Sequence, residues 1–407
     1  MATKTASKAT SEKKQLITAI KKTIKNNAPV PILEDVLLDY DRAIVSDLET
    51  AVSVPFKSGV QACVPADMLI NVMGMTDEPV IKNNGDLSVT FTEGKKAIKV
   101  VGDDVEQYPV YPMIMNKSEG VHTIGELTHD DIANIETALS FVSKDDLRPA
   151  MTGVYIAEEV VATDAHRMFW KAMSFPIQEG FIIPQKTVKI MLAMGGEYWT
   201  VKSCTEETRR IAIENEKGVI IEFRPIDANF PDYKAVIPQS EPRVKLYCSP
   251  NSILEELKNA GKFANKSTNQ VTFNMNGSLH ISAADVDFGF EYMNEHENGG
   301  RFEFAFNKKW EKKLNYKNKP VFKVIEAAGE ITMIQMRDDN YRLKDLSVKT
   351  SELIPEPDEL MIAFNSLLLS DIVSKCGENA IEIQLWESHK AVIINKNFLL
   401  MPLMLNQ

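Results

Sequence analysis

The sequence predicts an α+β protein built from three tandem copies of one domain, in which two helices pack on antiparallel sheets. Two recurring segments carry this prediction. An amphipathic helical segment recurs at intervals of roughly 120 residues. An extended residue pair that leads into an apolar helix also recurs, and its first two copies are separated by a similar distance along the chain. Short runs of alternating apolar and polar residues, typical of strands, lie between these segments.

Apolar residues at helical spacing indicate the first helix of each copy. The three segments are 13–26, about 128–143, and a stretch that begins near Ser249-Pro250. In the second segment, Thr128 followed by Asp131 is typical of a helix N-cap. The three apolar stripes are Leu16, Ile17, Ile20 and Ile24; Ile132, Ile135 and Leu139; and Ile253, Leu254 and Leu257.

The second helix of each copy follows a short extended segment. Val64-Pro65 leads into 68–73, Ile183-Pro184 into 188–194, and Ala363-Phe364 into 367–373. Proline suits the start of a helix, because the first backbone N–H groups have no partner inside the helix. The last interval is longer by roughly 60 residues, which predicts an insertion in the third copy.

The bulk composition is that of an ordinary soluble protein, with 44% hydrophobic and 25% charged residues. The four cysteines lie far apart, which favours reduced thiols in a cytoplasmic protein, and neither they nor the six histidines have metal-ligand spacing. No metal or cofactor is therefore expected. No apolar run is long enough to cross a membrane. Residues 1–12 are small and polar and are expected to form a disordered tail.

Several motifs together resemble the bacterial DNA polymerase III beta subunit, the replicative sliding clamp. They are the Thr-Asp-x-His-Arg run at 163–167, Phe230-Pro231-Asp232-Tyr233, Arg148-Pro149 before Gly153, and Met401-Pro402-Leu403, with Val30-Pro31-Ile32-Leu33 and Ser46-Asp47-Leu48-Glu49 near the start. Each motif alone is weak, but their order and spacing are specific. The resemblance spans residues 13 to 405.

The resemblance implies three clamp domains, at 13–121, 122–242 and 243–407. The region 299–360 departs from the family pattern and accounts for the excess length. A second Ala-Phe-Asn, at 305–307, offers another place for the last helix. We prefer the one at 363–365, because the chain then closes with the terminal strand of the family.

The resemblance implies a non-catalytic accessory subunit of DNA polymerase that forms a ring. Two copies would associate head to tail, and a heterologous contact of this kind closes a ring when the rotation allows it. The helices would line the hole, with double-stranded DNA inside. By analogy, an edge strand with Ile98 and Val100 would pair with the third domain of the second copy, where Phe263 could pack.

Binding to DNA would be independent of sequence and would use phosphate contacts from lysines. The net charge of −11 argues against DNA unless the basic residues gather on one surface. Asp130, Asp131 and Glu136 on the first helix of the second domain oppose the prediction. The resemblance implies a cytoplasmic protein that is associated with the nucleoid. The candidate DNA-facing residues are Lys14, Lys21, Lys22, Lys25, Lys186, Lys189, Lys258 and Lys262.

The family also binds short peptides of polymerases, the clamp loader and repair proteins in a hydrophobic pocket between the second and third domains. Ala165 stands where the family usually has glycine, and Ala235 and Met404 stand where arginine is common, so the pocket should be more apolar here. The residues carried over by motif are Met151, Thr163, Ala165, His166, Arg167, Met168, Pro231, Val236, Leu399, Leu400, Met401, Pro402, Leu403 and Leu405.

Other interpretations remain open from the sequence. Asp164 could orient His166 as a general base in an enzyme, although no established catalytic motif accompanies the pair. Asp164 could instead cap a turn, with Arg167 paired to a carboxylate, and this is compatible with a docking role. The terminal apolar run could be only a buried last strand. Finally, the chain could be a clamp-like scaffold that does not encircle DNA.

Overall fold

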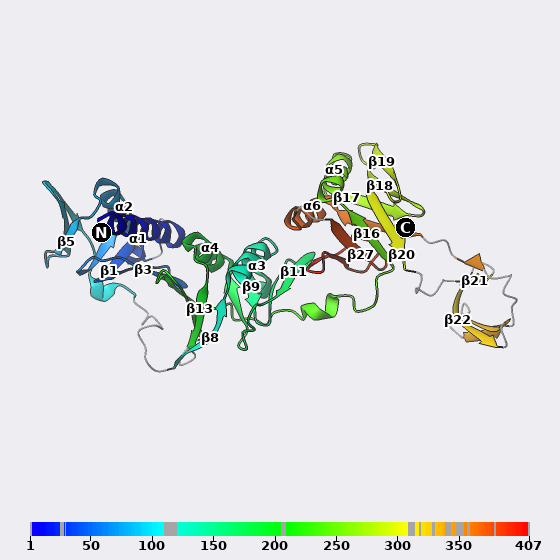
Figure 1. Cartoon of the computed structure of the whole chain (residues 1–407), viewed down its shortest axis with the longest axis horizontal. Helices are drawn as coiled ribbons and strands as arrows, with labels where there is room; N and C mark the ends of the chain where they lie inside the picture. The colour runs from blue at the N-terminus through cyan, green and yellow to red at the C-terminus, as the bar shows by residue number, and fades with distance from the viewer. Residues whose placement is uncertain are drawn as a thin grey trace. The chain divides into compact units, whose positions relative to one another are not determined.

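The structure is a computed structural model that describes residues 2–24, 28, 30–109, 120–204, 209–307, 359–377 and 380–405, together with the backbone of five strands within 314–355. It consists of two compact units, Met1–Pro231 and Asp232–Gln407. Figure 1 shows that helices and antiparallel strands alternate along both units. The expected α+β class is confirmed.

A continuous antiparallel sheet of eight strands runs through the first unit, in the order β4-β1-β2-β3-β15-β14-β13-β8. It joins the two sequence repeats of this unit, because β3 pairs with β15 in a register that sets Thr50 opposite Phe223 and Ser53 opposite Ile220. The strands are β1 (Asp35–Asp39), β2 (Arg42–Ser46), β3 (Thr50–Pro55), β4 (Gln61–Pro65), β8 (Val121–Leu127), β13 (Trp199–Cys204), β14 (Arg210–Asn215) and β15 (Ile220–Phe223).

Four helices cover one face of this sheet (Figure 1). α1 (Ala2–Thr23) packs on β2 and β3, and α4 (Gln185–Met194) packs on β15 and against α1. The other two are α2 (Ala66–Met75) and α3 (His129–Leu139). The strand side chains beneath the helices are apolar and fully buried, so this face is the main core of the unit. They include Val36, Leu38, Val45, Val52, Val54, Ile213, Ile221 and Phe223.

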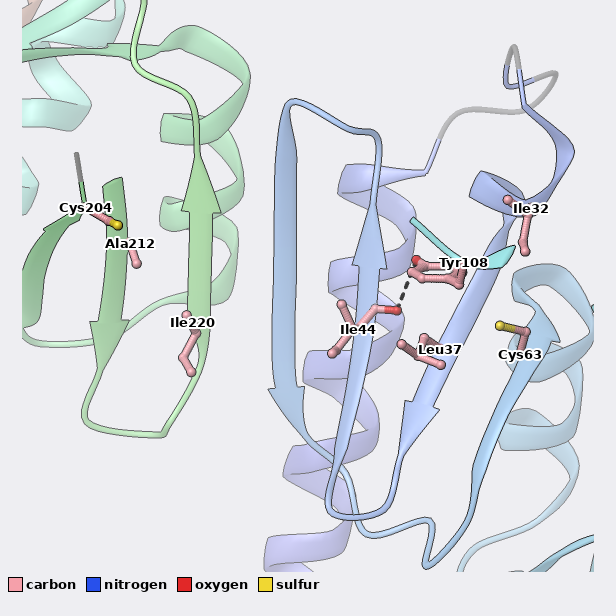
Figure 2. Packing of buried hydrophobic residues seen from close by; sticks show 8 residues of the cluster. All are labelled: Ile32, Leu37, Ile44, Cys63, Tyr108, Cys204, Ala212 and Ile220. Atoms are coloured by element: carbon pink, nitrogen blue, oxygen red, sulfur yellow. Dashed lines mark hydrogen bonds between the residues drawn. The ribbon is translucent and has the colours of Figure 1, made fainter. Parts of the chain in front are cut away.

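The opposite face of the sheet carries a second apolar cluster, shown in Figure 2. It includes Tyr108, whose hydroxyl donates to the carbonyl oxygens of Ile44 and Asp35, each over 3.4 Å. The chain before Tyr108 passes close to β4, where a Cβ on Gly102 would lie 1.9 Å from the Cys63 carbonyl oxygen. Only glycine fits there. The other members of the cluster are Ile32, Leu37, Ile44, Cys63, Cys204, Ala212 and Ile220.

Two smaller antiparallel sheets complete the first unit. One has the order β5-β6-β7, so β7 is an edge strand; the other contains the neighbours β12-β9-β10-β11. Their strands are β5 (Val80–Asn83), β6 (Ser88–Glu93), β7 (Lys96–Val101), β9 (Gly153–Ile156), β10 (Glu159–Thr163), β11 (Arg167–Ala172) and β12 (Phe181–Pro184).

The second unit repeats this architecture. α5 (Pro250–Ala260) and α6 (Ser366–Lys375) pack on each other, beside one run of strands in the order β29-β28-β27-β16-β20 and another in the order β19-β18-β17-β26. The strands are β16 (Val244–Cys248), β17 (Gln270–Met275), β18 (Ser278–Asp285), β19 (Phe290–Glu297), β20 (Phe302–Phe306), β26 (Leu360–Asn365), β27 (Ile381–Leu385), β28 (Val392–Ile394) and β29 (Phe398–Leu400).

The insertion predicted around 299–360 contains a sheet of its own. Its strands lie in the order β24-β23-β22-β21-β25, between β20 and β26 along the chain. They are β21 (Leu314–Tyr316), β22 (Lys319–Ala327), β23 (Glu330–Arg337), β24 (Leu343–Leu346) and β25 (Ile354–Pro355). The additional sheet therefore lies in the region where the sequence predicts an insertion.

The three predicted strand-to-helix transitions are confirmed. α2, α4 and α6 are each ten residues long and begin directly after Pro65, Pro184 and Asn365. The Asn365 side chain caps α6, since its oxygen accepts the amide N–H groups of Leu367 and Leu368. The alternative Ala-Phe-Asn behaves differently: Asn307 follows β20, and its side chain donates to the Glu241 carboxylate at 3.1 Å.

The first helix of each repeat also forms. The Thr128 hydroxyl accepts the Asp131 amide, which confirms the expected N-cap, and the Asp131 carboxylate in turn accepts the Thr128 amide. α1 differs from expectation, because it begins at Ala2 rather than near residue 13. The expected tail at 1–12 thus contains helix, since the segment has no proline or glycine to end it. The division into three clamp domains stays a prediction.

Candidate functional site

Side-chain hydrogen bonds close the turn between β10 and β11. The Thr163 hydroxyl donates to the Arg167 carbonyl (2.9 Å) and accepts the Ala165 amide (3.1 Å). One Asp164 oxygen accepts the amides of His166 (3.0 Å) and Arg167 (2.9 Å). Short polar side chains that bind the following amides in this way stabilise tight turns. The turn is therefore locally ordered by its own sequence.

The Arg167 side chain ties this turn to the end of α3. Arg167 Nε donates to the other Asp164 oxygen at 2.9 Å, and the guanidinium also donates to the Ser140 carbonyl at 2.9 Å. It lies 4.9 Å from the centre of the Phe141 ring, within the range of a cation–π contact. The interpretation that Asp164 caps a turn and Arg167 pairs with a carboxylate is confirmed.

The same geometry gives no support to Asp164 and His166 as an acid–base pair. Both Asp164 oxygens already accept hydrogen bonds from Arg167 or from backbone amides. His166 is exposed, and within the part of the chain that the structure describes no hydrogen bond joins its ring to Asp164. A general base needs an orienting partner of this kind. The turn is better suited to contact than to catalysis.

Ala165 stands in the left-handed region, with φ of +73°. For a residue with a Cβ this conformation costs roughly 1–2 kcal/mol, which glycine avoids. The hydrogen bonds from Thr163 and Asp164 hold the turn in this shape. The exposed methyl group of Ala165 and the His166 ring are what the turn presents to solvent.

The other expected pocket residues of the first unit lie on ordered segments. Met151 is half-buried in a short 3-10 helix, Pro149–Met151, and its carbonyl accepts the Ser143 amide at 2.8 Å. Pro231 is half-buried and follows Phe230, whose ring stacks on Tyr155 at 4.9 Å. Met168 is only 2% exposed, so it supports the turn from beneath rather than forming its surface.

In the second unit, the expected pocket residues divide into buried and accessible members. Leu399 and Leu400 are buried in β29, as the alternative of a buried last strand predicts. The chain beyond them is held by the Leu403 amide, which donates to the Ala363 carbonyl at 2.8 Å. Met401 and Met404 are exposed, and Val236 is exposed in the 3-10 helix Tyr233–Val236. Pro402, Leu403 and Leu405 are half-buried.

The predicted DNA-facing lysines also divide into two classes. Six are exposed on or directly after helices: Lys14, Lys21 and Lys22 on α1, Lys189 on α4, Lys258 on α5, and Lys262 just after it. Lys25 lies outside the described residues. Lys186 differs from its assignment as a DNA contact, because its half-buried ammonium pairs with the Asp47 carboxylate and donates to the Thr23 carbonyl at 2.9 Å.

The acidic residues of α3 present less negative charge against DNA binding than the sequence suggested. Asp130 and Glu136 are exposed. Asp131 is buried and accepts hydrogen bonds from Thr128 and from the amide and hydroxyl of Ser174. Two carboxylates rather than three therefore face solvent on this helix.

The expected edge strand forms one side of an apolar groove. The groove lies between α2 and β7, with a volume of about 320 Å³. Val100 is buried and Ile98 is half-buried beneath it. Phe263, the third residue of the expected interface, lies in the second unit, and its ring stacks on Tyr292 at 5.6 Å. The lining residues are Met68, Asn71, Val72, Met75, Ile98, Lys99, Val100 and Val101.

The α2 side of this groove was missed from the sequence. Met68 and Met75 lie seven residues apart, so they share a helix face, and both are exposed. The whole segment is apolar, and its pattern does not distinguish a buried face from an exposed one. Among the described residues, no cluster of His, Cys, Asp or Glu side chains could hold a metal ion, and no helix is long and apolar enough to span a bilayer.

Comparison with known proteins gives one consistent result, although no family model matches the sequence. The chain is 24% identical to the beta sliding clamp of Chlamydia pneumoniae over 323 residues, which is 72% of this chain and 84% of that protein. It is 26% identical to the beta sliding clamp of Bacillus subtilis over 189 residues, or 44% and 48% of the two chains.

Solved structures agree over nearly the whole length. The DNA polymerase III beta subunit of Thermotoga maritima superposes with a TM-score of 0.68 at 18% identity, covering 97% of this chain and 98% of that one. A Pseudomonas aeruginosa DNA polymerase sliding clamp superposes with a TM-score of 0.70 at 15% identity, and the match covers 98% of each chain. The fold is that of the sliding clamps. Together, this fold and the sequence relatives show that the chain is a divergent homologue of the bacterial beta sliding clamps.

Proposed function

We propose that this chain is a DNA sliding clamp, a processivity factor that encircles duplex DNA and tethers DNA polymerase. The observation that carries the proposal is the likeness to sliding clamps over 97–98% of the chain, together with exposed lysines on the helices. A closed ring holds DNA by topology, so its contacts to phosphates can be weak and can slide. The acidic net charge is compatible with this if the acids lie away from the helices.

The ring would be a head-to-tail homodimer. Two features support this part of the proposal: β7 is an unpaired edge with apolar residues at Ile98 and Val100, and Phe263 is an accessible aromatic residue of the second unit. Edge strands with apolar neighbours associate readily with other strands. A contact between unlike surfaces of two copies closes into a ring when the rotation allows it.

Partner proteins would bind through a peptide pocket that uses both units. Support comes from each wall separately: the ordered turn with Thr163, Ala165, His166 and Arg167 in the first, and the accessible tail residues in the second. A Pseudomonas aeruginosa sliding clamp has been solved with griselimycin bound. Exposed alanine at 235 and methionine at 404 would make this pocket more apolar and more adaptable.

The decisive experiment is retention on DNA of defined topology. The protein, loaded onto nicked circular plasmid with a bacterial clamp loader, should stay bound through gel filtration at moderate salt and be lost when the plasmid is cut once. Light scattering should give a mass near twice 45.7 kDa. Retention that survives linearisation, or no retention by a loaded dimer, would favour a scaffold that does not encircle DNA.

A further inference from the structure

The insertion in the second unit begins with a strongly basic stretch of sequence. Residues 308–323 contain seven lysines and one glutamate, a net charge of +6 in a chain whose net charge is −11. Three aromatic residues, Trp310, Tyr316 and Phe322, lie among the lysines at intervals of six residues. Lysines with aromatic residues between them are typical of surfaces that bind nucleic acid, because ammonium groups attract phosphates and bases stack on the rings.

The pairing of the inserted strands places their basic residues toward one end of the sheet. Tyr316 at the end of β21 pairs with Lys319 at the start of β22. Arg337 at the end of β23 pairs with Leu343 at the start of β24. Because the strands are antiparallel, the start of β22 lies beside the end of β23, so these positions share one end of the sheet. Toward this end, called the basic end, lie the lysine and arginine positions of the five strands: Lys319, Lys323, Arg337 and Lys344.

The other end of the same sheet is acidic. Ala327 at the end of β22 pairs with Glu330 at the start of β23, and Glu326 lies next to Ala327 along the chain. Asp345, which pairs with Gln335, is the one acidic position of these strands toward the basic end. On a typical solvated surface the two signs of charge are interspersed. Their separation along these strands gives the sheet a field that attracts a polyanion to the basic end.

Two aromatic positions also lie toward the basic end. Tyr316 is directly opposite Lys319. Phe322 is the extra residue of a β-bulge, because the register with β23 shifts between Val321 and Lys323, and bulges are common beside functional sites. Bases of a single strand are free to stack on aromatic rings, whereas a duplex keeps its bases stacked on each other. An acidic protein segment would use the lysines but not the rings. Lysines and rings together therefore favour a single-stranded nucleic acid.

We propose that the basic end of the inserted sheet binds single-stranded DNA. Its lysines and arginine contact phosphates, and Tyr316 and Phe322 stack on bases. The site belongs to the insertion, so it is separate from the proposed encirclement of duplex DNA and does not depend on ring closure. A replicating template is single-stranded ahead of the duplex, and this site would bind that unpaired strand.

The charged part of the site is tested by fluorescence anisotropy of the full chain with a labelled oligothymidylate of about 20 nucleotides. The basic-end variant combines four substitutions and should raise the dissociation constant at least about tenfold. It should also reduce the slope of log affinity against log salt by about three, as expected for four lost phosphate contacts to a single strand. The four substitutions are Lys319→Gln, Lys323→Gln, Arg337→Gln and Lys344→Gln.

The matched control lies at the other end of the same sheet. Glu326→Gln with Glu330→Gln should not weaken binding, because it removes negative charge. Lys258→Gln with Lys262→Gln, on and after α5, should leave the affinity unchanged. A folded basic-end variant that binds like the parent overturns the proposal, and so does a loss of binding confined to the α5 variant. Circular dichroism checks that each variant folds.

The aromatic part is tested by Tyr316→Ala with Phe322→Ala. The dissociation constant should rise about tenfold or more, with an unchanged salt slope, because stacking is lost while phosphate contacts remain. Tyr316→Phe keeps the ring and should bind like the parent. A duplex of the same length should bind the parent more weakly than the single strand. Equal binding of duplex and single strand overturns the assignment to a single strand.

Photo-cross-linking locates the site without any variant. An oligonucleotide that contains 4-thiothymidine should attach to peptides within 314–327, whereas cross-links confined to α1, α4 or α5 overturn the proposal. Binding of polyglutamate but not of the oligonucleotide would assign the basic end to an acidic protein segment instead. Retention on nicked circular plasmid should be the same for the basic-end variant and the parent. If the parent is not retained but binds the oligonucleotide at the basic end, the sliding-clamp proposal fails and this one stands.

Discussion

Lys186 Nζ donates to the Thr23 carbonyl oxygen over 2.9 Å, so the first residues of α4 satisfy the last turn of α1. The last carbonyls of a helix have no partner within it, and a lysine both fills this need and opposes the helix dipole. Asp47 pairs with the same ammonium. Beside it, the hydroxyls of Thr50 and Thr187 lie 3.1 Å apart. These contacts hold the two repeats of the first unit together.

Lys186→Met should therefore lower stability rather than DNA affinity. The loss removes a charged hydrogen bond and leaves Asp47 unpaired, and because the pair is partly exposed we expect about 1–2 kcal/mol from urea unfolding. Lys189→Met, on the exposed face of the same helix, should leave stability unchanged and reduce the salt dependence of DNA binding. The reverse pattern would return Lys186 to the DNA-facing set.

The conformation of Ala165 predicts a graded response to substitution. Ala165→Gly should be neutral or stabilise the fold by up to about 1 kcal/mol, because glycine adopts a φ of +73° without strain but has a more flexible unfolded chain. Ala165→Val should destabilise it by about 1–2 kcal/mol, since a branched side chain is strongly disfavoured in this region. Thermal unfolding of both variants measures the order, and equal stabilities would contradict it.

Local signals made much of the fold predictable. Pro65, Pro184 and Asn365 mark the starts of α2, α4 and α6 because the preference of these residues for helix starts acts within a few residues. The pairing of Asp164 with Arg167 in a turn was predictable for the same reason, because the two residues lie only three positions apart.

What the sequence could not show depends on distant partners. Lys186 looked like a free cation because its partner carbonyl belongs to Thr23, 163 residues earlier. The groove needs α2 and β7 together, and an apolar run such as 68–73 fits a buried or an exposed face equally well. Burial of Met168 likewise depends on what packs over its strand.

Gly102 should tolerate no side chain. A Cβ there would lie 1.9 Å from the Cys63 carbonyl oxygen and 2.8 Å from its carbon, so Gly102→Ala must displace backbone and should cost about 2–3 kcal/mol. Gly74→Ala is the matched control, because Gly74 lies in α2 with open space around it. Alanine there should stabilise the helix by about 0.5–1 kcal/mol. Urea unfolding of the two variants should move in opposite directions.

Asp35 should make the stability of the first unit depend on pH. Burial, and then the nearby charge of Asp103, raise the pKa of Asp35 to about 7. The folded chain then keeps a proton that the unfolded chain releases near pH 4, so stability falls as pH rises from about 4 to about 7. The total effect is at most about 4 kcal/mol, from three pH units of difference.

Asp35→Asn removes this dependence, because the amide does not ionise. The variant should lose less stability than the parent between pH 5 and pH 8, and it should be the more stable of the two at pH 8. Asp103→Asn should reduce the slope without abolishing it, since Asp103 is a secondary cause of the shift. Parallel curves for parent and Asp35→Asn in urea unfolding at several pH values would show that Asp35 is ionised in the folded chain.

Removal of residues 404–407 should weaken ligand binding without unfolding the second unit. Met404 is 74% exposed and supports no core, while the bond that fixes the tail, from the Leu403 amide to the Ala363 carbonyl, is retained. Griselimycin is a suitable probe, because a sliding clamp of the same fold binds it. We expect about a tenfold rise in its dissociation constant by calorimetry, as for loss of the apolar contacts of Met404 and Leu405. Removal of residues 403–407 should weaken binding further and also lower the unfolding temperature, because the Ala363 carbonyl then loses its partner. Equal affinity of parent and both truncations for the probe would place the ligand site elsewhere on the chain.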